Sequence, residues 1–242
     1  MTIQIKSPLK YFATTVGKAK LTEVNKNNFD LTFDNIIWMG YSSSCWQAAE
    51  FAIELDNAYG KCVTTGLGLG IIQTLLSLNP KVTEVIVYER QQDIIDMFKI
   101  FAEHSNFDIS KIKIICQNAD DIVNVDCDCL FLDHFEPESQ QEIIRKVKNI
   151  VEKNTAKFVW FWPAAQIYLE YIGRQNLKIH KDSFREWATS LVIKSFPVDL
   201  LDTSFDYIKE LKYMYIDSSP IMGKVIDNLD NRNALLNIFK KR

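Results

Sequence analysis

The stretch KCVTTGLGLGIIQTLL, residues 61–76, gives the strongest local indication of how this protein folds. It places Gly66, Gly68 and Gly70 at alternate positions between a short β-branched run and an apolar run with helical spacing. In an open sheet of parallel strands, ligands bind beyond the carboxyl ends of the strands, and glycines in the first strand-to-helix turn let the backbone approach a nucleotide. Because glycines also make tight turns where no ligand binds, the stretch by itself predicts only a strand, a turn and a helix.

The chain after residue 60 continues this alternation. Near-continuous apolar runs are followed by amphipathic ones, which is typical of a parallel sheet covered by helices on both faces. We expect strands at 61–65, 83–89, 111–116, 128–133 and 156–162, and helices at 70–79, 91–105 and 138–154. Beyond residue 163 the pattern is weaker, with helices expected at 164–175 and 182–195 and a strand or hairpin at 207–217. The sequence therefore predicts a doubly wound α/β fold with a mostly parallel sheet.

Composition excludes several classes of protein. The 242 residues carry a net charge of -3, and 47% of them are hydrophobic, as in ordinary soluble domains. The longest apolar run, FVWFWPAA from Phe158, is shorter than the ~20 residues of a membrane-spanning helix. No secretory signal is visible, so we expect a cytoplasmic protein. Cys127 and Cys129 have no second pair at zinc spacing, which predicts no metal site. The charge gives no support for nucleic acid as a partner, and a homodimer stays open.

An acidic residue after the next predicted strand strengthens the nucleotide interpretation. Glu89 ends the run VIVYE about twenty residues after the glycines, where a carboxylate can accept hydrogen bonds from both hydroxyls of a ribose. The dinucleotide fingerprint would need Gly or Ala where Ile71 stands, and a triphosphate-binding loop would need Lys after Gly70. These two positions disfavour a nicotinamide-dependent oxidoreductase and a nucleoside triphosphate enzyme.

This order of glycines and acidic residue resembles the class I S-adenosylmethionine-dependent methyltransferase superfamily, which has a Rossmann-like, seven-stranded sheet. The resemblance implies an S-adenosylmethionine-binding domain over residues 46–242, preceded by a small β-containing extension over residues 1–45. It also implies cofactor contacts from the glycine turn, from the end of the second strand and from the segment after the third strand. These residues are Gly66, Leu67, Gly68, Gly70, Glu89, Arg90, Asn118 and Ala119.

A second motif narrows the resemblance. The loop DHFEPE, residues 133–138, resembles the D-x-x-D-P signature of spermidine-synthase-like aminopropyltransferases, with Glu136 in place of the second aspartate. Those enzymes use decarboxylated S-adenosylmethionine and, like this chain with its Thr64, lack an acidic residue that many methyltransferases carry before the glycines. The segment WMGYSSSCWQAAE, residues 38–50, is similar in layout to guanidinoacetate-methyltransferase-like proteins. Both resemblances imply a small, amine-bearing substrate.

Alkyl transfer from a sulfonium to an amine needs alignment, a carboxylate that stabilises the cation, and a route for one proton. Asp133 and Glu136 are our candidates for these catalytic roles, although carboxylates there could simply favour the start of the following helix. Tyr41, Trp46 and His134 are candidates for substrate contacts. Methyl transfer to a small amine is our first hypothesis and aminopropyl transfer the second. A non-catalytic nucleoside-binding protein and an NAD(P)-dependent oxidoreductase stay open as alternatives.

Overall fold

The computed structural model describes residues 7–26, 28–41, 55, 58–136, 138–162, 164 and 167. The chain separates into two compact units, Met1–Phe161 and Trp162–Arg242. Most of the described residues belong to the first unit, and the elements below are part of it. The expected elements beyond residue 167 and the expected domain boundary after residue 45 lie outside the described residues, so they stay predictions.

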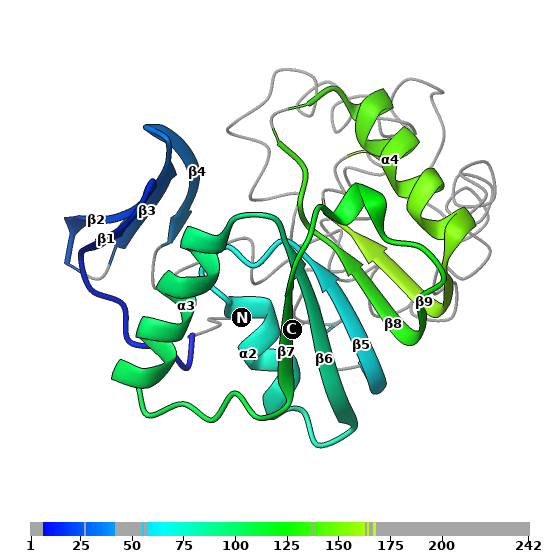
Figure 1. Ribbon diagram of the computed structural model, residues 1–242, viewed down its shortest axis with the longest axis horizontal. Coiled ribbons are helices and arrows are strands. Elements are labelled where there is room, and N and C mark those ends of the chain that lie inside the picture. The colour runs from blue at the N-terminus through cyan, green and yellow to red at the C-terminus, as the bar shows by residue number, and fades with distance from the viewer. Residues whose placement is uncertain are drawn as a thin grey trace, which may run out of the picture. The chain divides into compact units, whose positions relative to one another are not determined.

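A parallel sheet of five strands forms the centre of the first unit, in the order β7-β6-β5-β8-β9 (Figure 1). The strands are β5 (Gly60–Thr65), β6 (Val82–Glu89), β7 (Ile112–Cys116), β8 (Asp126–Leu132) and β9 (Thr155–Phe161). Each pair of neighbours is parallel. This order, which starts in the middle and grows outward in both directions, is the doubly wound, class I methyltransferase-like arrangement that the sequence predicts.

Strand register brings three loops to one edge of the sheet. Thr65, the last residue of β5, is paired with Tyr88 of β6 on one side and with Leu132 of β8 on the other. The residues that follow these three strands therefore emerge together at the carboxyl edge of the sheet, which is where ligands bind in such folds. The glycine turn, Glu89 and Asp133 all belong to this edge.

Helices cover both faces of the sheet. Helices α2 (Ile71–Leu78) and α3 (Gln92–His104) pack against β6 and β7, whereas α4 (Gln140–Lys153) packs against β9 on the other side (Figure 1). The apolar positions of α3 recur at helical spacing and end in Phe98 and Phe101, which are almost completely buried. Helix α4 begins after Ser139, whose hydroxyl accepts a hydrogen bond from the amide of Glu142. A short 3-10 turn, η1 (Ala119–Asp121), follows β7 and is absent from our expectations.

The N-terminal extension contains a separate antiparallel sheet, in the order β1-β2-β3-β4. Its strands are β1 (Thr14–Val16), β2 (Ala19–Asn25), β3 (Asn28–Phe33) and β4 (Ile36–Tyr41). Asp34 and Asn35 join β3 to β4, and both have positive φ, as a two-residue hairpin turn requires. The β-containing extension expected before the parallel sheet is thus confirmed.

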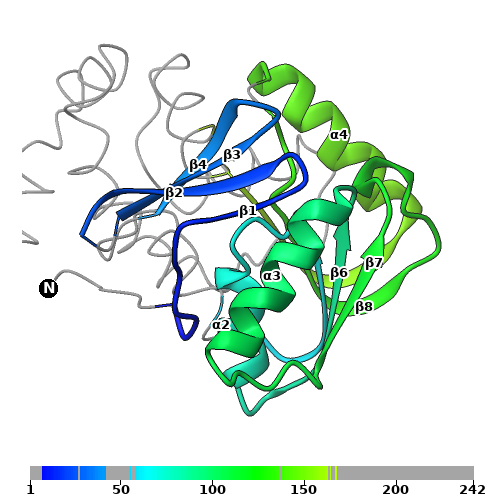
Figure 2. The same ribbon diagram turned by 60° about the vertical axis from the view of Figure 1, so that its left-hand side comes forward.

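The N-terminal segment lies beside helix α3 (Figure 2), and aromatic side chains pack between the two. The rings of Tyr11 and Phe12 lie edge-on to Phe101 with centroid distances of 5.2 Å and 5.4 Å. The Tyr11 hydroxyl donates a hydrogen bond of 3.0 Å to the carbonyl of Leu69 in the glycine turn. Met39 of β4 also lies close to this turn. Its sulfur is 3.0 Å from the position that a Cβ on Gly68 would take. The extension therefore contacts the turn on which our nucleotide interpretation rests.

Candidate active site at the carboxyl edge of the sheet

The glycine turn has a backbone that only glycine adopts easily. Gly66, Gly68 and Gly70 have φ values of 75°, 51° and 76°, in the left-handed region. At Gly66 there is also no room, since an added Cβ would lie 2.1 Å from the carbonyl oxygen of Asp133. The strand, turn and helix predicted from residues 61–76 are confirmed. The turn is also in direct backbone contact with the loop after β8.

Glu89 supports the turn from the neighbouring strand. It is only 5% exposed, and its Oε2 accepts a hydrogen bond of 2.9 Å from the amide of Leu67. Its Oε1 accepts one of 2.8 Å from the amide of Gln91. Burial raises the pKa of Glu89 even though these hydrogen bonds and the Arg90 charge act in the opposite direction. Each oxygen keeps a second lone pair, so the carboxylate can hold the turn and still accept from a hydroxyl group.

A neutral pair takes the place of the acidic residue that many methyltransferases carry at position 64. The buried amide of Gln73 donates from Nε2 to Thr64 Oγ1 at 3.1 Å and to the carbonyl of Gly66 at 2.8 Å. Its Oε1 is buried and has no donor among the described residues. Our sequence reasoning missed Gln73. The signal available was a polar residue within the apolar first turn of the predicted helix, IIQTLL.

The segment after β7 lies next to the end of β6. The amide of Gln117 donates to the carbonyl of Glu89 at 3.0 Å. Asn118 caps η1 by accepting a hydrogen bond of 3.1 Å from the amide of Asp120, and Ala119 is buried. The structure therefore brings together the expected ribose and adenine contacts, Glu89 and the 118–119 segment.

Asp133 follows β8 directly and faces the glycine turn with its backbone. Its amide donates to both the carbonyl and the Oγ1 of Thr65, each at 3.1 Å. Among the described residues none forms a hydrogen bond or an ion pair with its carboxyl group. Burial without a compensating cation raises the pKa of Asp133 to about 7. A carboxyl group with this pKa can both take up and release a proton near neutral pH.

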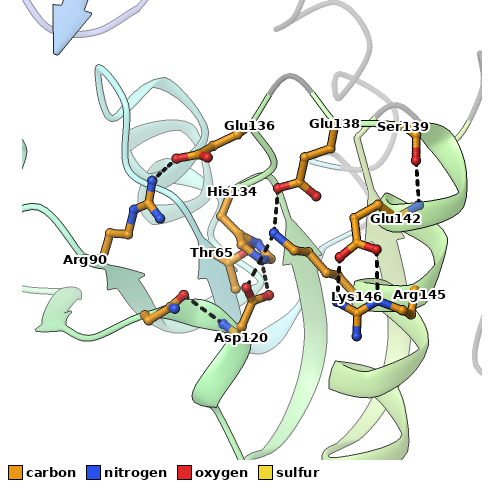
Figure 3. A network of polar contacts seen from close by, with 11 residues as sticks. Thr65, Arg90, Asp120, His134, Glu136, Glu138, Ser139, Glu142, Arg145 and Lys146 are labelled. Carbon is orange, nitrogen blue, oxygen red and sulfur yellow. Dashed lines mark hydrogen bonds and ion pairs between the residues drawn. The ribbon is translucent and has the colours of Figure 1, made fainter. Parts of the chain in front are cut away.

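The other acidic residues of this loop are paired with cations (Figure 3). Glu136 forms an exposed ion pair with Arg90, whose guanidinium lies 6.0 Å from the ring centroid of Trp38 in β4. Glu138 accepts a hydrogen bond of 2.6 Å from Lys146 of α4. Asp133 and Glu136, which we expected to act together, thus have different surroundings, and Ser139 rather than either carboxylate caps α4.

His134 lies between these groups and is largely buried, with 11% of its side chain exposed. Its Nδ1 is 2.7 Å from Thr65 Oγ1, and its Nε2 is 3.2 Å from Asp120 Oδ1. Burial lowers the pKa of His134 despite the neighbouring Asp120 carboxylate. That His134 contacts the substrate stays a prediction. Both ring nitrogens already have partners within the protein.

Two expected substrate contacts cannot be placed in this site. Tyr41 is the last residue of β4, but its side chain is outside the described part of the structure, as is the whole of Trp46.

Among the described residues, no group of three His, Cys, Asp or Glu side chains could hold a metal ion. Within the same part of the chain, no helix combines the length and apolarity needed to cross a membrane.

The sequence matches no protein-family model and no curated protein significantly. Solved structures with a similar arrangement include spermidine synthase from Thermotoga maritima, with 12% identity, a TM-score of 0.45, and coverage of 61% of this chain and 54% of that one. Spermidine synthase in complex with the transition state analogue AdoDATO gives 14% identity, a TM-score of 0.43, and coverage of 61% and 53%.

Phosphoethanolamine N-methyltransferase 1 from Haemonchus contortus, in complex with phosphoethanolamine and S-adenosylhomocysteine, gives 17% identity, a TM-score of 0.35, and coverage of 46% and 24%. The chain thus spans about half the length of the spermidine synthases that it matches. At these identities the likeness concerns the fold alone.

Proposed function

We propose that this protein is an S-adenosylmethionine-dependent transferase that moves a methyl group to a small amine. The observation that supports this most is the backbone contact between Gly66 and Asp133 at the carboxyl edge of the sheet. A nucleoside held at the glycine turn would have the carboxyl group of Asp133 beside it. Asp133 has no cationic partner among the described residues, so it is the group available to an ammonium substrate.

The residues present fit such a cofactor. The amides of Gly68 and Leu69 donate to no described residue, so they are available to a ligand. Glu89 would accept from the ribose hydroxyls, and the segment of Asn118 and Ala119 would lie along the adenine edge. The cofactor supplies an electrophilic carbon on a sulfonium centre. The chain would supply alignment of the amine and, through Asp133, an acceptor for the proton that the amine loses.

Aminopropyl transfer from decarboxylated S-adenosylmethionine to a polyamine is the second candidate. The neutral pair of Thr64 and Gln73 favours it, because the aminopropyltransferases that the sequence resembles also lack an acidic residue at this position. Ile71 begins α2 directly after the last glycine and continues to disfavour NAD(P)-dependent oxidoreduction. We further propose a cytoplasmic location with no nucleic acid partner, supported by the buried free thiols of Cys62, Cys127 and Cys129 and by the net charge.

Calorimetric titration tests the proposal. The full chain is titrated with S-adenosylmethionine, S-adenosylhomocysteine, decarboxylated S-adenosylmethionine and NADH, and is then assayed against mono-, di- and polyamines. Preference for S-adenosylmethionine with turnover supports the methyltransferase, and preference for the decarboxylated form supports the aminopropyltransferase. Binding with no turnover on any amine would identify a non-catalytic nucleoside-binding protein. No binding of the three sulfur nucleosides would refute the proposal.

Replacing Glu89 with glutamine should weaken binding of these nucleosides by roughly tenfold or more, because charge-assisted hydrogen bonds to the ribose become neutral ones. The raised pKa of Glu89 gives a second expectation. The carboxylate form is lost as pH falls through this pKa, so affinity should begin to fall at a higher pH than an exposed glutamate would allow. Titration calorimetry of Glu89→Gln and of the exposed Glu103→Gln control, at several pH values, measures both effects. Equal affinities in the two variants would contradict the ribose role.

A further inference from the structure

Three segments that are distant in the sequence meet at the imidazole of His134 (Figure 3). Thr65 ends strand β5 and is fully buried, with its Oγ1 2.7 Å from Nδ1. Asp120 belongs to η1, and its Oδ1 is 3.2 Å from Nε2. His134 itself is the residue after Asp133. The ring therefore links the loop after β8 to the strand that carries the glycine turn and to the segment that follows β7.

The donors and acceptors of these contacts fit a neutral ring with its hydrogen on Nε2. The amide of Asp133 donates to Thr65 Oγ1, so the Thr65 hydroxyl hydrogen is free to point at Nδ1. A neutral ring that accepts at Nδ1 carries its hydrogen on Nε2, where it donates to Asp120. The Thr65 hydroxyl then donates to Nδ1, and Nε2 donates to the Asp120 carboxylate, so each donor in these contacts has an acceptor. A doubly protonated ring would leave the Thr65 hydroxyl hydrogen without this acceptor.

Two carboxylates, Asp120 and Glu138, and one cation, Lys146, surround the ring. Lys146 of α4 lies 3.5 Å from Asp120 Oδ2 and 2.6 Å from Glu138 Oε1. Burial by itself raises the pKa of Asp120, but the hydrogen bond from His134 and the charge of Lys146 together lower it. Asp120 is thus an anion that Lys146 partly neutralises, and it orients the imidazole while the burial of the ring favours the neutral form.

We propose that His134 is a positioning residue that, through Thr65 and Asp120, fixes the backbone of Asp133 relative to the glycine turn. It does not touch the reacting atoms. The inference rests on the proposed function, because the purpose of the link is to hold the Asp133 carboxyl group in line with a donor bound at the turn. A misplacement of about 1 Å at such a centre can reduce the rate of the chemical step about 100-fold.

Thr65→Val and Thr65→Ser form the test pair. Valine has nearly the same shape and removes the hydroxyl, whereas serine keeps it. We expect Thr65→Val to lower the single-turnover rate by about 10-fold to 100-fold with less than about 3-fold change in nucleoside affinity, and Thr65→Ser to keep most of the rate. Thermal stability is measured for both. A rate in Thr65→Val equal to that of the wild type, or a loss of affinity as large as the loss of rate, would overturn the proposal.

A measurement independent of turnover separates this inference from the proposed function. Long-range proton–nitrogen NMR on histidine-labelled full chain reports which ring nitrogen carries the hydrogen. We expect His134 to be the neutral tautomer with hydrogen on Nε2 at pH 7, and Thr65→Val to shift the Nδ1 resonance, because the hydrogen bond at Nδ1 is lost while the one from Nε2 to Asp120 stays. If no amine is alkylated and the tautomer is found, the proposed reaction fails and the link stands. A ring protonated on both nitrogens at pH 7, or hydrogen on Nδ1 alone, refutes the link whatever the activity.

Discussion

Asp133→Asn should lower the turnover rate by about 100-fold or more while nucleoside affinity stays within a few-fold of the wild type. Asparagine keeps the size of the side chain and leaves the backbone contacts of residue 133 with Thr65 in place. It cannot take up a proton from the amine or offset the charge that develops on the nitrogen. Single-turnover kinetics and calorimetry on the same preparation measure the two quantities, with Asp126→Asn at the exposed start of β8 as control.

The pH dependence of the same variant gives an independent check. Because the pKa of Asp133 is raised to about 7, the wild-type rate should rise as pH increases through about 7 and the carboxylate forms. In the folded protein the protonated form is preferred, so the stabilisation from the bound proton is lost as pH rises from the unfolded pKa to about 7. Asp133→Asn should therefore melt at a higher temperature than the wild type at pH 8, by roughly a few degrees. Unchanged turnover in this variant would remove Asp133 from the mechanism.

Gly66→Ala should abolish detectable nucleoside binding and strongly destabilise the fold. An alanine at φ 75° is strained, and its Cβ would lie 2.1 Å from the backbone oxygen of Asp133. Strain and overpacking of this kind cost on the order of 2–5 kcal/mol together. The neighbour is backbone, so relief requires the turn and the loop after β8 to move apart.

Gly40→Ala is the matched control for Gly66→Ala. Gly40 lies in strand β4, and its nearest neighbour, Asp30 Oδ1, would be 3.4 Å from the new Cβ. We expect its melting temperature and nucleoside affinity to stay close to those of the wild type. Thermal melts measure the melting temperature of both variants, and calorimetry measures their nucleoside affinity. A Gly66→Ala protein with wild-type stability and affinity would mean that the turn does not have the geometry described above.

The parallel sheet was predictable because strands that are buried on both faces are apolar at nearly every position. Runs such as VIVYE and CLFLD are apolar at nearly every position, and the amphipathic runs between them have one apolar face. The antiparallel sheet is harder to read. Strand β2, AKLTEVN, buries only Ala19 and Leu21, so its alternation covers too few residues to stand out from loop sequence.

The site was predictable only as far as position along the chain determines contact. Glu89 ends a parallel strand, and Gly66 and Asp133 directly follow two others, so their meeting at one edge follows from the fold. The hydrogen-bond and ion-pair partners of individual side chains do not follow from the fold. Nothing in the loop 133–138 shows that Glu136 pairs with Arg90 whereas Glu138 pairs with Lys146. The same holds for the link from His134 to Thr65 and Asp120, which joins three separate segments.

The central position of strand β5 has a consequence for folding kinetics. Its partner β6 is close in sequence, but its other partner is β8, and the bond from the amide of Lys61 to Asp128 spans 67 residues. Pairings over such separations form late, because the chain entropy of closing the loop must be overcome first. The glycine turn needs β8 for its final shape, since Asp133 both bonds to Thr65 and bounds Gly66. Contacts made after the folding barrier act mainly on the unfolding rate. A nucleoside bound at this turn would therefore extend the lifetime of the native state without hastening its formation.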